Sequence, residues 1–284
     1  MDWQLATRMM TTGRLARLGT LATQFQGELN ETNDVAKGVL SELPTNGPQV
    51  IRGVHVCLYC TREASQGDAI YVNVARFGER EKGDSKATHH RQVRAGFQRK
   101  SPQNNFRRLI ATLIPAGAYL LESVSYVPAH QSKLPLAFVV AVLNSKLAEW
   151  YFRLGSTNAQ VSEYQFDVLP CPIFAAEKTP ADRALFNAAK AALDTRDYAK
   201  VLATLDPACQ TAPFPRAVRD VIITATERII AIESARGDIV RTARSALDLA
   251  AHPYQDLIDG LFYRLAGLSA VEAAGLESRL AQML

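Results

Sequence analysis

The sequence predicts an α+β fold, and three observations support this. Up to about residue 174, short β-like segments alternate with turns rich in Gly, Asp, Asn and Pro. One long apolar run within that part has helical spacing, and from Thr179 onward the whole chain has the periodicity of amphipathic helices. With 284 residues, 48% of them hydrophobic, the chain can bury a sizeable core in one large or two modest domains. We expect a β-rich module over 1–175 with an embedded helix, followed by a helical bundle over 176–284.

The strands of the first part are expected where β-branched and aromatic residues gather between turn signals. These segments are 54–59, 69–74, 91–98, 109–114 and 119–127. Residues 135–154 are too long an apolar run for one strand, and Leu147, Trp150 and Tyr151 continue it at helical spacing. This run predicts a single helix, which the polar residues 155–158 end.

The second part carries helix start and stop signals. Thr179 followed by Asp182 three residues later predicts a capped helix start. Pro253 is expected to end one helix, and Ser269 with Glu272 predicts a capping box for the last one. One apolar stripe of a long helix contains Val218, Val221, Ile222, Ala225, Ile229 and Ile232.

Positive charge is concentrated in one stretch. Residues 76–108 contain ten Lys/Arg and three carboxylates, a net charge of +7 in a chain whose total is +4. Five amide side chains interleave with these cations: Gln92, Gln98, Gln103, Asn104 and Asn105. Guanidinium and amide groups pair bidentately with guanine and adenine edges in the major groove. The stretch indicates a polyanion partner, and a solvated basic loop is an alternative of about equal weight for the charge alone.

The basic stretch supplies the first set of candidate DNA contacts. Lysines and arginines within it are expected to contact phosphates and to make binding depend on salt. The candidates for reading base edges are Arg94, Gln98, Asn104, Asn105 and Arg107, and further basic candidates are Arg99, Lys100 and Arg108.

Six short motifs follow one another along most of the chain. They are Gly27–Asp34, Pro48–Gly53 followed by Tyr59, Arg91–Arg108, Leu143-Asn144-Ser145, Leu169-Pro170-Cys171-Pro172 and Leu257–Ser269. In this order and spacing they resemble the TaqI-like C-terminal specificity (target-recognition) domain of type II restriction–modification adenine-specific DNA methyltransferases. The resemblance implies that Asn30, Asn33 and Arg52 also contact DNA.

The resemblance also implies the partners. Double-stranded DNA would be the ligand, and a methyltransferase domain, N-terminal or on a separate subunit, would methylate adenine at N6 with S-adenosylmethionine. This sequence contains neither Gly-x-Gly nor Pro-Pro, so it lacks the motifs that hold the methyl donor and the flipped adenine. We therefore expect no catalytic residue and no cofactor in this chain, which should not methylate by itself.

Two other chemistries are alternatives to this interpretation. Asp84-Ser85-Lys86 with Asp68 could belong to a Mg²⁺-dependent nuclease, but no second placed carboxylate accompanies the triplet, and a polar loop is preferred. His55, Cys57 and Cys60 could be zinc ligands, yet their alternation with Val and Leu favours an apolar strand, so no metal is expected.

A third alternative is an interaction module that does not bind DNA and whose basic stretch is only a soluble loop. The longest apolar run, 134–143, is too short to cross a bilayer, and no charged-then-apolar leader opens the chain. We therefore expect a cytoplasmic protein without a membrane partner.

Overall fold

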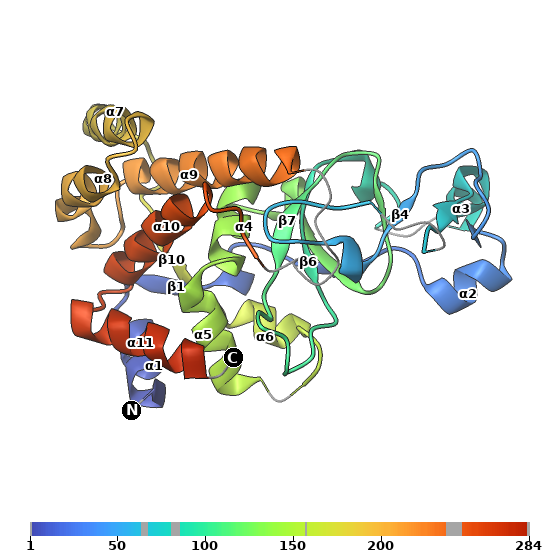
Figure 1. The fold of residues 1–284 in the computed structure, drawn as a ribbon, viewed down its shortest axis with the longest axis horizontal. Coiled ribbons are helices and arrows are strands. Elements are labelled where there is room, and N and C mark those ends of the chain that lie inside the picture. Colours follow the sequence, from blue (N-terminus) through green and yellow to red (C-terminus); the bar gives the residue numbers. More distant parts are fainter. Residues whose placement is uncertain (1, 64–67, 81–85, 157, 237–245, 283–284) are drawn as a thin grey trace.

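The chain has an α+β fold in its computed structural model, which describes residues 2–63, 68–80, 86–156, 158–236 and 246–282. Most helices lie at one end of the molecule and the main sheet lies in the middle (Figure 1). A small lobe that carries α2 (Glu31–Ala36) and α3 (Val74–Arg80) projects at the other end. Within the described ranges, no helix combines the length and the apolar character needed to cross a membrane. The expected fold class is therefore confirmed.

The strands are short and mostly antiparallel. Strands β2, β9, β6 and β7 form a four-stranded sheet in that order, and three further two-stranded pairs are β1–β10, β3–β5 and the parallel pair β4–β8. Their bounds are β1 Leu15–Arg17, β2 Phe25–Gln26, β3 Leu40–Ser41, β4 Val50–Ile51, β5 Tyr71–Val72, β6 Arg94–Gln98, β7 Ala111–Ile114, β8 Tyr119–Leu120, β9 Val124–Pro128 and β10 Pro170–Pro172.

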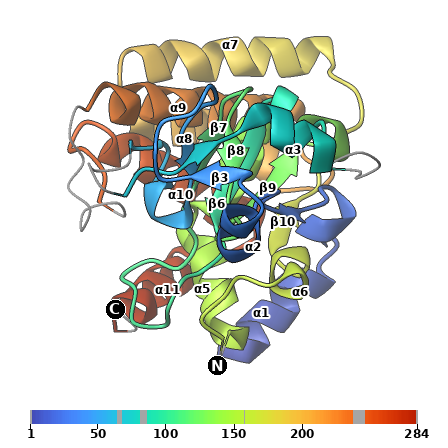
Figure 2. The same ribbon diagram turned by 90° about the vertical axis from the view of Figure 1, so that its right-hand side faces the viewer.

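The helices cover the sheet and fill the C-terminal part. Helix α4 packs against β6 and β7 on one side and against α9 on the other, and α7 packs on α9 at the outer surface (Figure 2). Their bounds are α1 Asp2–Thr11, α2 Glu31–Ala36, α3 Val74–Arg80, α4 Leu136–Leu143, α5 Lys146–Gly155, α6 Glu163–Asp167, α7 Pro180–Asp194, α8 Tyr198–Leu205, α9 Arg216–Ala235, α10 His252–Leu265 and α11 Ala270–Gln282.

The single helix expected over 135–154 is wrong, because two helices meet there at Asn144 and Ser145. The Asn144 amide accepts from the backbone N–H of Ala111 (2.9 Å) and donates to the carbonyl of the same residue (2.9 Å). The Ser145 hydroxyl accepts from the N–H of Ala148 (3.1 Å) and so caps α5. Both side chains therefore satisfy backbone groups of the protein.

The strand expected over 54–59 is also wrong. Residues Gly53–His55 form a 3₁₀ turn, and Tyr59 adopts a left-handed backbone with φ of 62°. The backbone N–H of Cys57 donates to the carbonyl of Cys60 (2.9 Å), which closes a tight turn. Val56, Leu58 and Tyr59 are buried, so the apolar residues of this segment indicate burial and not extended backbone. Within 69–74, only Tyr71–Val72 is a strand, and β6 and β7 confirm shortened forms of the strands expected over 91–98 and 109–114. The single strand expected over 119–127 is wrong, because β8 and β9 lie there and belong to different sheets.

The helix signals of the second part are mostly confirmed. Thr179 caps α7 in a reciprocal capping box with Asp182. Ser269 and Glu272 form the expected box before α11, with the Glu272 N–H donating to the Ser269 hydroxyl (3.3 Å). Pro253 does not end a helix, because it lies in the first turn of α10, where the missing N–H of proline has no partner to lose.

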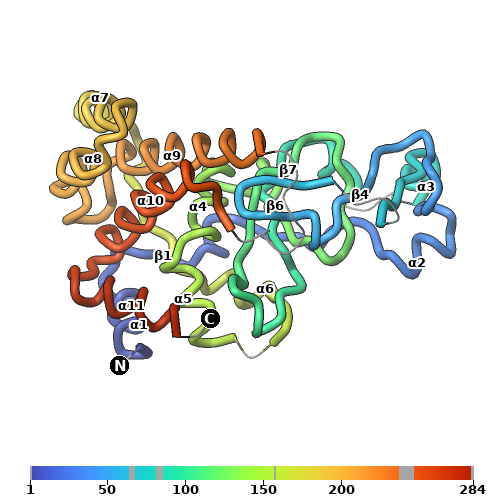
Figure 3. Tube along the Cα trace, in the orientation of Figure 1, coloured from blue at the N-terminus to red at the C-terminus, as the bar shows by residue number. Residues whose placement is uncertain are grey.

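Two hydrophobic clusters hold the molecule together. The large one takes residues from both parts of the sequence, including Trp150 of α5, Phe166 of α6 and Ile222 of α9. A smaller cluster lies in the projecting lobe. Its members are Leu29, Val39, Leu40, Val50, Ile70, Val72, Phe77, Tyr119 and Leu121. The first and last helices, α1 and α11, lie on the same side of the molecule (Figure 3). The division at residue 175 stays a prediction, and the large core spans it.

Candidate nucleic-acid interface

Two polar loops lie side by side at the surface beyond the end of β6. One follows β6 (99–107) and the other follows α5 (158–161), and we call them the paired loops. The backbone N–H of Ser101 donates to the carbonyl of Ala159 (2.8 Å), and a second backbone bond beside it joins Val161 to the first loop (2.8 Å). Segments about 60 residues apart in the sequence therefore form one surface.

Side chains of α5 bind the backbone of the first of the paired loops. The buried Glu149 carboxylate accepts from the backbone N–H groups of Arg108 (3.0 Å) and Leu109 (2.8 Å). Arg153 forms an ion pair with Glu149 (2.6 Å) and donates to the carbonyl of Asn105 (2.9 Å). These contacts fix the loop backbone before any ligand arrives.

Arg108 ties the two loops to each other. Its guanidinium donates to the carbonyl of Ser101 (3.0 Å), to the Ser156 hydroxyl (2.8 Å) and to the carbonyl of Asn158. The group also lies over the Phe152 ring, 4.7 Å from its centroid, and burial lowers its pKa. Since Arg108 is 1% exposed, its donors serve the protein interior, and we no longer assign it a contact with DNA.

Arg94 and Gln98 are buried in β6. Arg94 donates to both carboxylate oxygens of Glu28 (3.1 Å each) and is 0% exposed. Gln98 donates to the carbonyl of Val56 (2.7 Å). Both side chains point to protein partners and away from solvent, so the structure removes them from the residues that could read base edges.

The other candidates of the basic stretch lie at the surface of the paired loops. Lys100 and Asn104 are exposed, and Arg99, Asn105 and Arg107 are half-buried. The Arg107 guanidinium donates to the carbonyls of Leu109 (2.9 Å) and Asn144. All five lie on the first of the paired loops, and their contact with DNA stays a prediction.

The candidates from the resemblance gather around the first turn of α2. Asn30 caps this helix by accepting from the N–H of Asn33 (2.9 Å), whose own side chain is exposed. Arg52 donates to both oxygens of the Glu31 carboxylate (3.1 and 3.2 Å). Part of the polar capacity of Asn30 and Arg52 is therefore used inside the protein, and the rest faces solvent.

An acidic pair connects this turn to the paired loops. Glu122 accepts from the N–H of Glu31 (3.2 Å) and lies 3.9 Å from the Lys100 ammonium. Two carboxylates, Glu122 and Glu31, thus lie between the cations of Lys100 and Arg52. The structure therefore brings together two groups of candidates that the sequence places about 50 residues apart.

A buried polar network behind Arg107 was not foreseen. The Tyr59 hydroxyl donates to the Gln255 side chain (2.5 Å), which in turn donates to the carbonyl of Asn144 (3.2 Å) and to Asp259 (3.0 Å). Asp259 also accepts from the N–H of Lys146 (2.8 Å), and burial raises the pKa of Asp259 to about 6. An acidic residue within the apolar face of a helix was the only signal for it in the sequence.

The described residues do not support the zinc site considered at His55, Cys57 and Cys60. In the part of the chain that the structure describes, no three His, Cys, Asp or Glu side chains could hold a metal ion together. Burial lowers the pKa of His55 to about 4, and its Nδ1 accepts from the N–H of Arg52 (3.1 Å). A hydrogen bond with Cys57, together with burial, raises the pKa of the Cys60 thiol. Asp84, the central residue of the nuclease alternative, lies outside the described residues.

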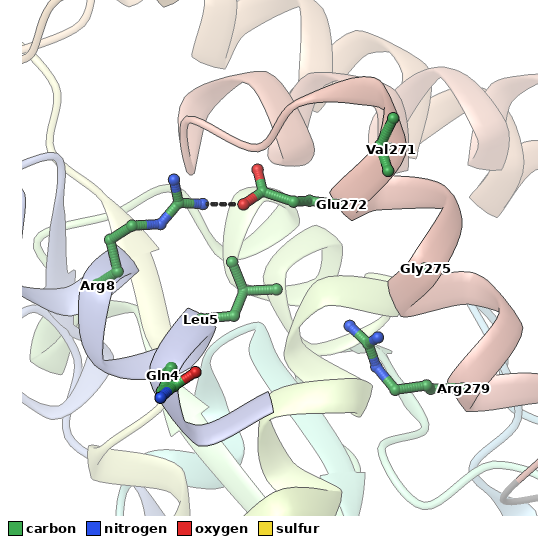
Figure 4. A pocket seen from close by; sticks show the side chains of 7 residues that line it. All are labelled: Gln4, Leu5, Arg8, Val271, Glu272, Gly275 and Arg279. Carbon is green, nitrogen blue, oxygen red and sulfur yellow. Dashed lines mark hydrogen bonds and ion pairs between the residues drawn. The ribbon is translucent and has the colours of Figure 1, made fainter. Parts of the chain in front are cut away.

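Two cavities lie near the last helix. One of about 490 Å³ opens between α1 and α11, where the ion pair of Arg8 with Glu272 (2.7 Å) bridges the helices above Leu5 (Figure 4). Another of about 290 Å³ lies beside Phe106 of the paired loops and is bounded by Glu277.

Comparison with known proteins gives one kind of match. No family model and no curated protein matches the sequence. Among solved structures, the fold is similar to the type IIL restriction–modification enzyme MmeI, determined in complex with DNA, at a TM-score of 0.46 and 10% sequence identity. The similarity covers 95% of this chain and 35% of MmeI, so the chain spans about a third of that enzyme's length.

Proposed function

We propose that this chain is the DNA-recognition module of a type II restriction–modification system. It directs N6-adenine methylation, and possible cleavage, by a catalytic domain that lies N-terminal to it or on another subunit. S-adenosylmethionine belongs to that catalytic partner. The motifs that resemble a TaqI-like specificity domain support the proposal, and so does the surface of the paired loops.

The observation that carries the proposal is the set of exposed and half-buried cationic and amide side chains on the first of those loops. Cationic and amide side chains stand on a backbone that buried Glu149 and Arg108 fix from within. A recognition surface benefits from such preorganisation, because less conformational freedom is lost when the ligand binds. Cations supply affinity for phosphate oxygens, and amide and guanidinium groups supply hydrogen bonds to base edges.

The residues divide the work by their chemistry. Arg99 and Lys100 contact phosphates, while Asn104, Asn105 and Arg107 read base edges. Each good bidentate pair contributes about 1–3 kcal/mol of discrimination against the wrong base. A second contact region is formed by Asn30, Asn33 and Arg52, on the other side of the carboxylates of Glu122 and Glu31.

A duplex-binding titration at several salt concentrations tests the proposal. The double variant Arg99→Ala/Lys100→Ala should bind more weakly, and the slope of log affinity against log salt should fall by about 2, because each lost phosphate contact removes about 0.9. The matched control is Arg183→Ala/Lys200→Ala, which removes two exposed cations from α7 and α8. Equal salt slopes for the two double variants would contradict the assignment.

The same titration separates the alternatives. A chain that ignores duplexes even in dilute buffer would be an interaction module of another kind, and unaided methyl transfer would overturn the division between recognition and catalysis. The nuclease alternative would require plasmid cleavage with Mg²⁺ that Asp84→Asn abolishes.

A further inference from the structure

An aromatic pocket of about 310 Å³ opens next to the paired loops. It lies between α1, β1, α5 and α6, elements from distant parts of the sequence. Its volume falls at the lower end of the range for small-ligand sites, about 300–1,000 Å³. The side chains that shape it are Trp3, Arg17, Tyr151, Phe152, Tyr164 and Gln165.

Two of these aromatic rings face solvent. Trp3 is 62% exposed and Tyr164 is 75% exposed, while Tyr151 is half-buried and Phe152 is buried. Gly155 lies under the Trp3 ring, where even an added Cβ would only touch the ring, at 3.8 Å. Large exposed aromatic side chains around a hollow do little for the core and are typical of binding sites.

We propose that this pocket receives a nucleobase that has left the stack of the bound DNA. The inference rests on the proposed function and adds a second mode of contact to it. Each base has a π face that stacks on aromatic rings, and this stacking tolerates any sequence. Arg17 at the pocket adds a positive charge, which attracts the phosphates that flank an unstacked base and disfavours a cationic ligand.

Shared residues connect the pocket to the paired loops. Gln165 lines the pocket and donates to the Ser156 hydroxyl (2.9 Å), which also accepts from Arg108 (2.8 Å). Phe152 contributes to the pocket wall and carries the Arg108 guanidinium over its ring. DNA that contacts the loops therefore lies beside the pocket, and a single unpaired nucleotide has a short path into it.

The fluorescence of Trp3 can report the entry of a base into the pocket. It has two tryptophans, of which Trp150 is fully buried and Trp3 is exposed in the pocket. Three duplexes of one sequence serve as probes: one with a single unpaired adenine, one with an abasic nucleotide at the same place, and one fully paired. Only the unpaired adenine should quench the Trp3 emission strongly and bind more tightly than the paired duplex, because the abasic probe has the same backbone but no ring to stack.

Variants then assign the effect to the pocket. Trp3→Ala and Tyr164→Ala should each weaken binding of the unpaired-adenine duplex by about tenfold, and Trp3→Phe should keep most of the affinity because a ring remains. Leu249→Ala, which removes an 87% exposed apolar side chain outside the pocket, should change nothing.

The outcomes separate this inference from the proposed function. Binding of the paired duplex with unchanged Trp3 emission, and equal affinity for all three probes, would overturn the inference and leave the recognition module intact. Equal quenching by the abasic probe would also overturn it, because the backbone alone would then explain the contact. No binding of any probe would overturn both.

Discussion

The two ends of β6 carry the same kind of residue in opposite environments. Arg94, the first residue of the strand, is completely buried against Glu28 and has the Tyr126 ring 4.8 Å from its guanidinium. Arg99 and Lys100, directly after the strand, lie on the surface of the paired loops. In the sequence, all three belong to one basic stretch, and all three were expected to contact DNA.

This difference teaches that the buried cations of a basic stretch have to be separated from the exposed ones before the stretch predicts a binding partner. A guanidinium leaves water only where a carboxylate and carbonyl oxygens replace its hydration. For Arg94, these are Glu28 and the carbonyl of Ala118 (2.5 Å). Residues 66 positions apart supply that pair, so local composition does not reveal it.

The largest effect on stability is expected from removing the buried ion pair of Arg94 with Glu28. Glu28→Ala leaves Arg94 buried without its counterion and should lower the free energy of unfolding by about 3–5 kcal/mol. Urea unfolding followed by circular dichroism measures this, with Glu122→Ala as the control, because Glu122 is half-buried and its cation partner, Lys100, is exposed. Similar stabilities for the two variants would refute the contrast between the ends of β6.

The buried network behind Arg107 should make stability depend on pH. Burial raises the pKa of Asp259 to about 6, above the ordinary value of about 3.9, so the folded state binds a proton that the unfolded state has already released. Its contribution is therefore fully present below pH of about 4 and is lost as pH rises toward 6, by about 3 kcal/mol in all. Unfolding measured from pH 4 to pH 8 for the native chain and for Asp259→Asn isolates this term. A stability difference that stays constant with pH would show that Asp259 titrates normally.

A smaller loss is expected from the clamp between α4 and β7. Asn144→Ala leaves the N–H of Ala111 without a partner in the interior, while the carbonyl of Ala111 keeps the N–H of Tyr59 as a donor (3.0 Å), and the change should cost about 2 kcal/mol. Asn33→Ala, at an exposed amide, should stay within about 0.5 kcal/mol. Thermal unfolding of both variants gives the comparison, and equal melting temperatures would argue against the clamp.

The smallest effect on stability is expected at the exposed end. Lys100→Ala removes a cation 3.9 Å from Glu122 and should change the free energy of unfolding by less than about 1 kcal/mol. Its effect should appear in duplex binding, as a salt slope lower by about 1. A large loss of stability without a change in the salt slope would assign Lys100 to the fold instead of to the ligand.

Much of the fold could be predicted because its signals are local. The capping boxes at Thr179 and Ser269 depend on residues three positions apart, and the apolar stripe of α9 depends on a period of 3.6. Pro253 misled because the same residue fits the first turn of a helix as well as the region after one. The break at Asn144 was missed although Ser145 caps α5 on a residue only three positions later, because the apolar run on both sides continues the helical pattern. The contact of Asn144 with Ala111, 33 residues away, has no local signal.

The candidate site could be predicted only in part. Its residue types and the basic stretch were visible, but the pairing of the loops through Ser101 and Ala159 was not. The aromatic pocket left no local signal either, since Trp3 and Tyr164 come from opposite ends of the first part of the chain. Such convergence depends on the path of the backbone through the whole molecule.

By itself, the sequence determined the α+β class, the helix caps and an excess of positive charge between residues 76 and 108. Only the tertiary structure decided which of those charges meets solvent, because burial depends on partners such as Glu28 and Glu149 that are distant along the chain. The physical reason is the free-energy cost of removing a charge from water. Arg94 and Arg108 can be buried because oxygen atoms of the protein accept their hydrogen bonds. Lys100 has no such set of acceptors within hydrogen-bond distance among the described residues and is exposed.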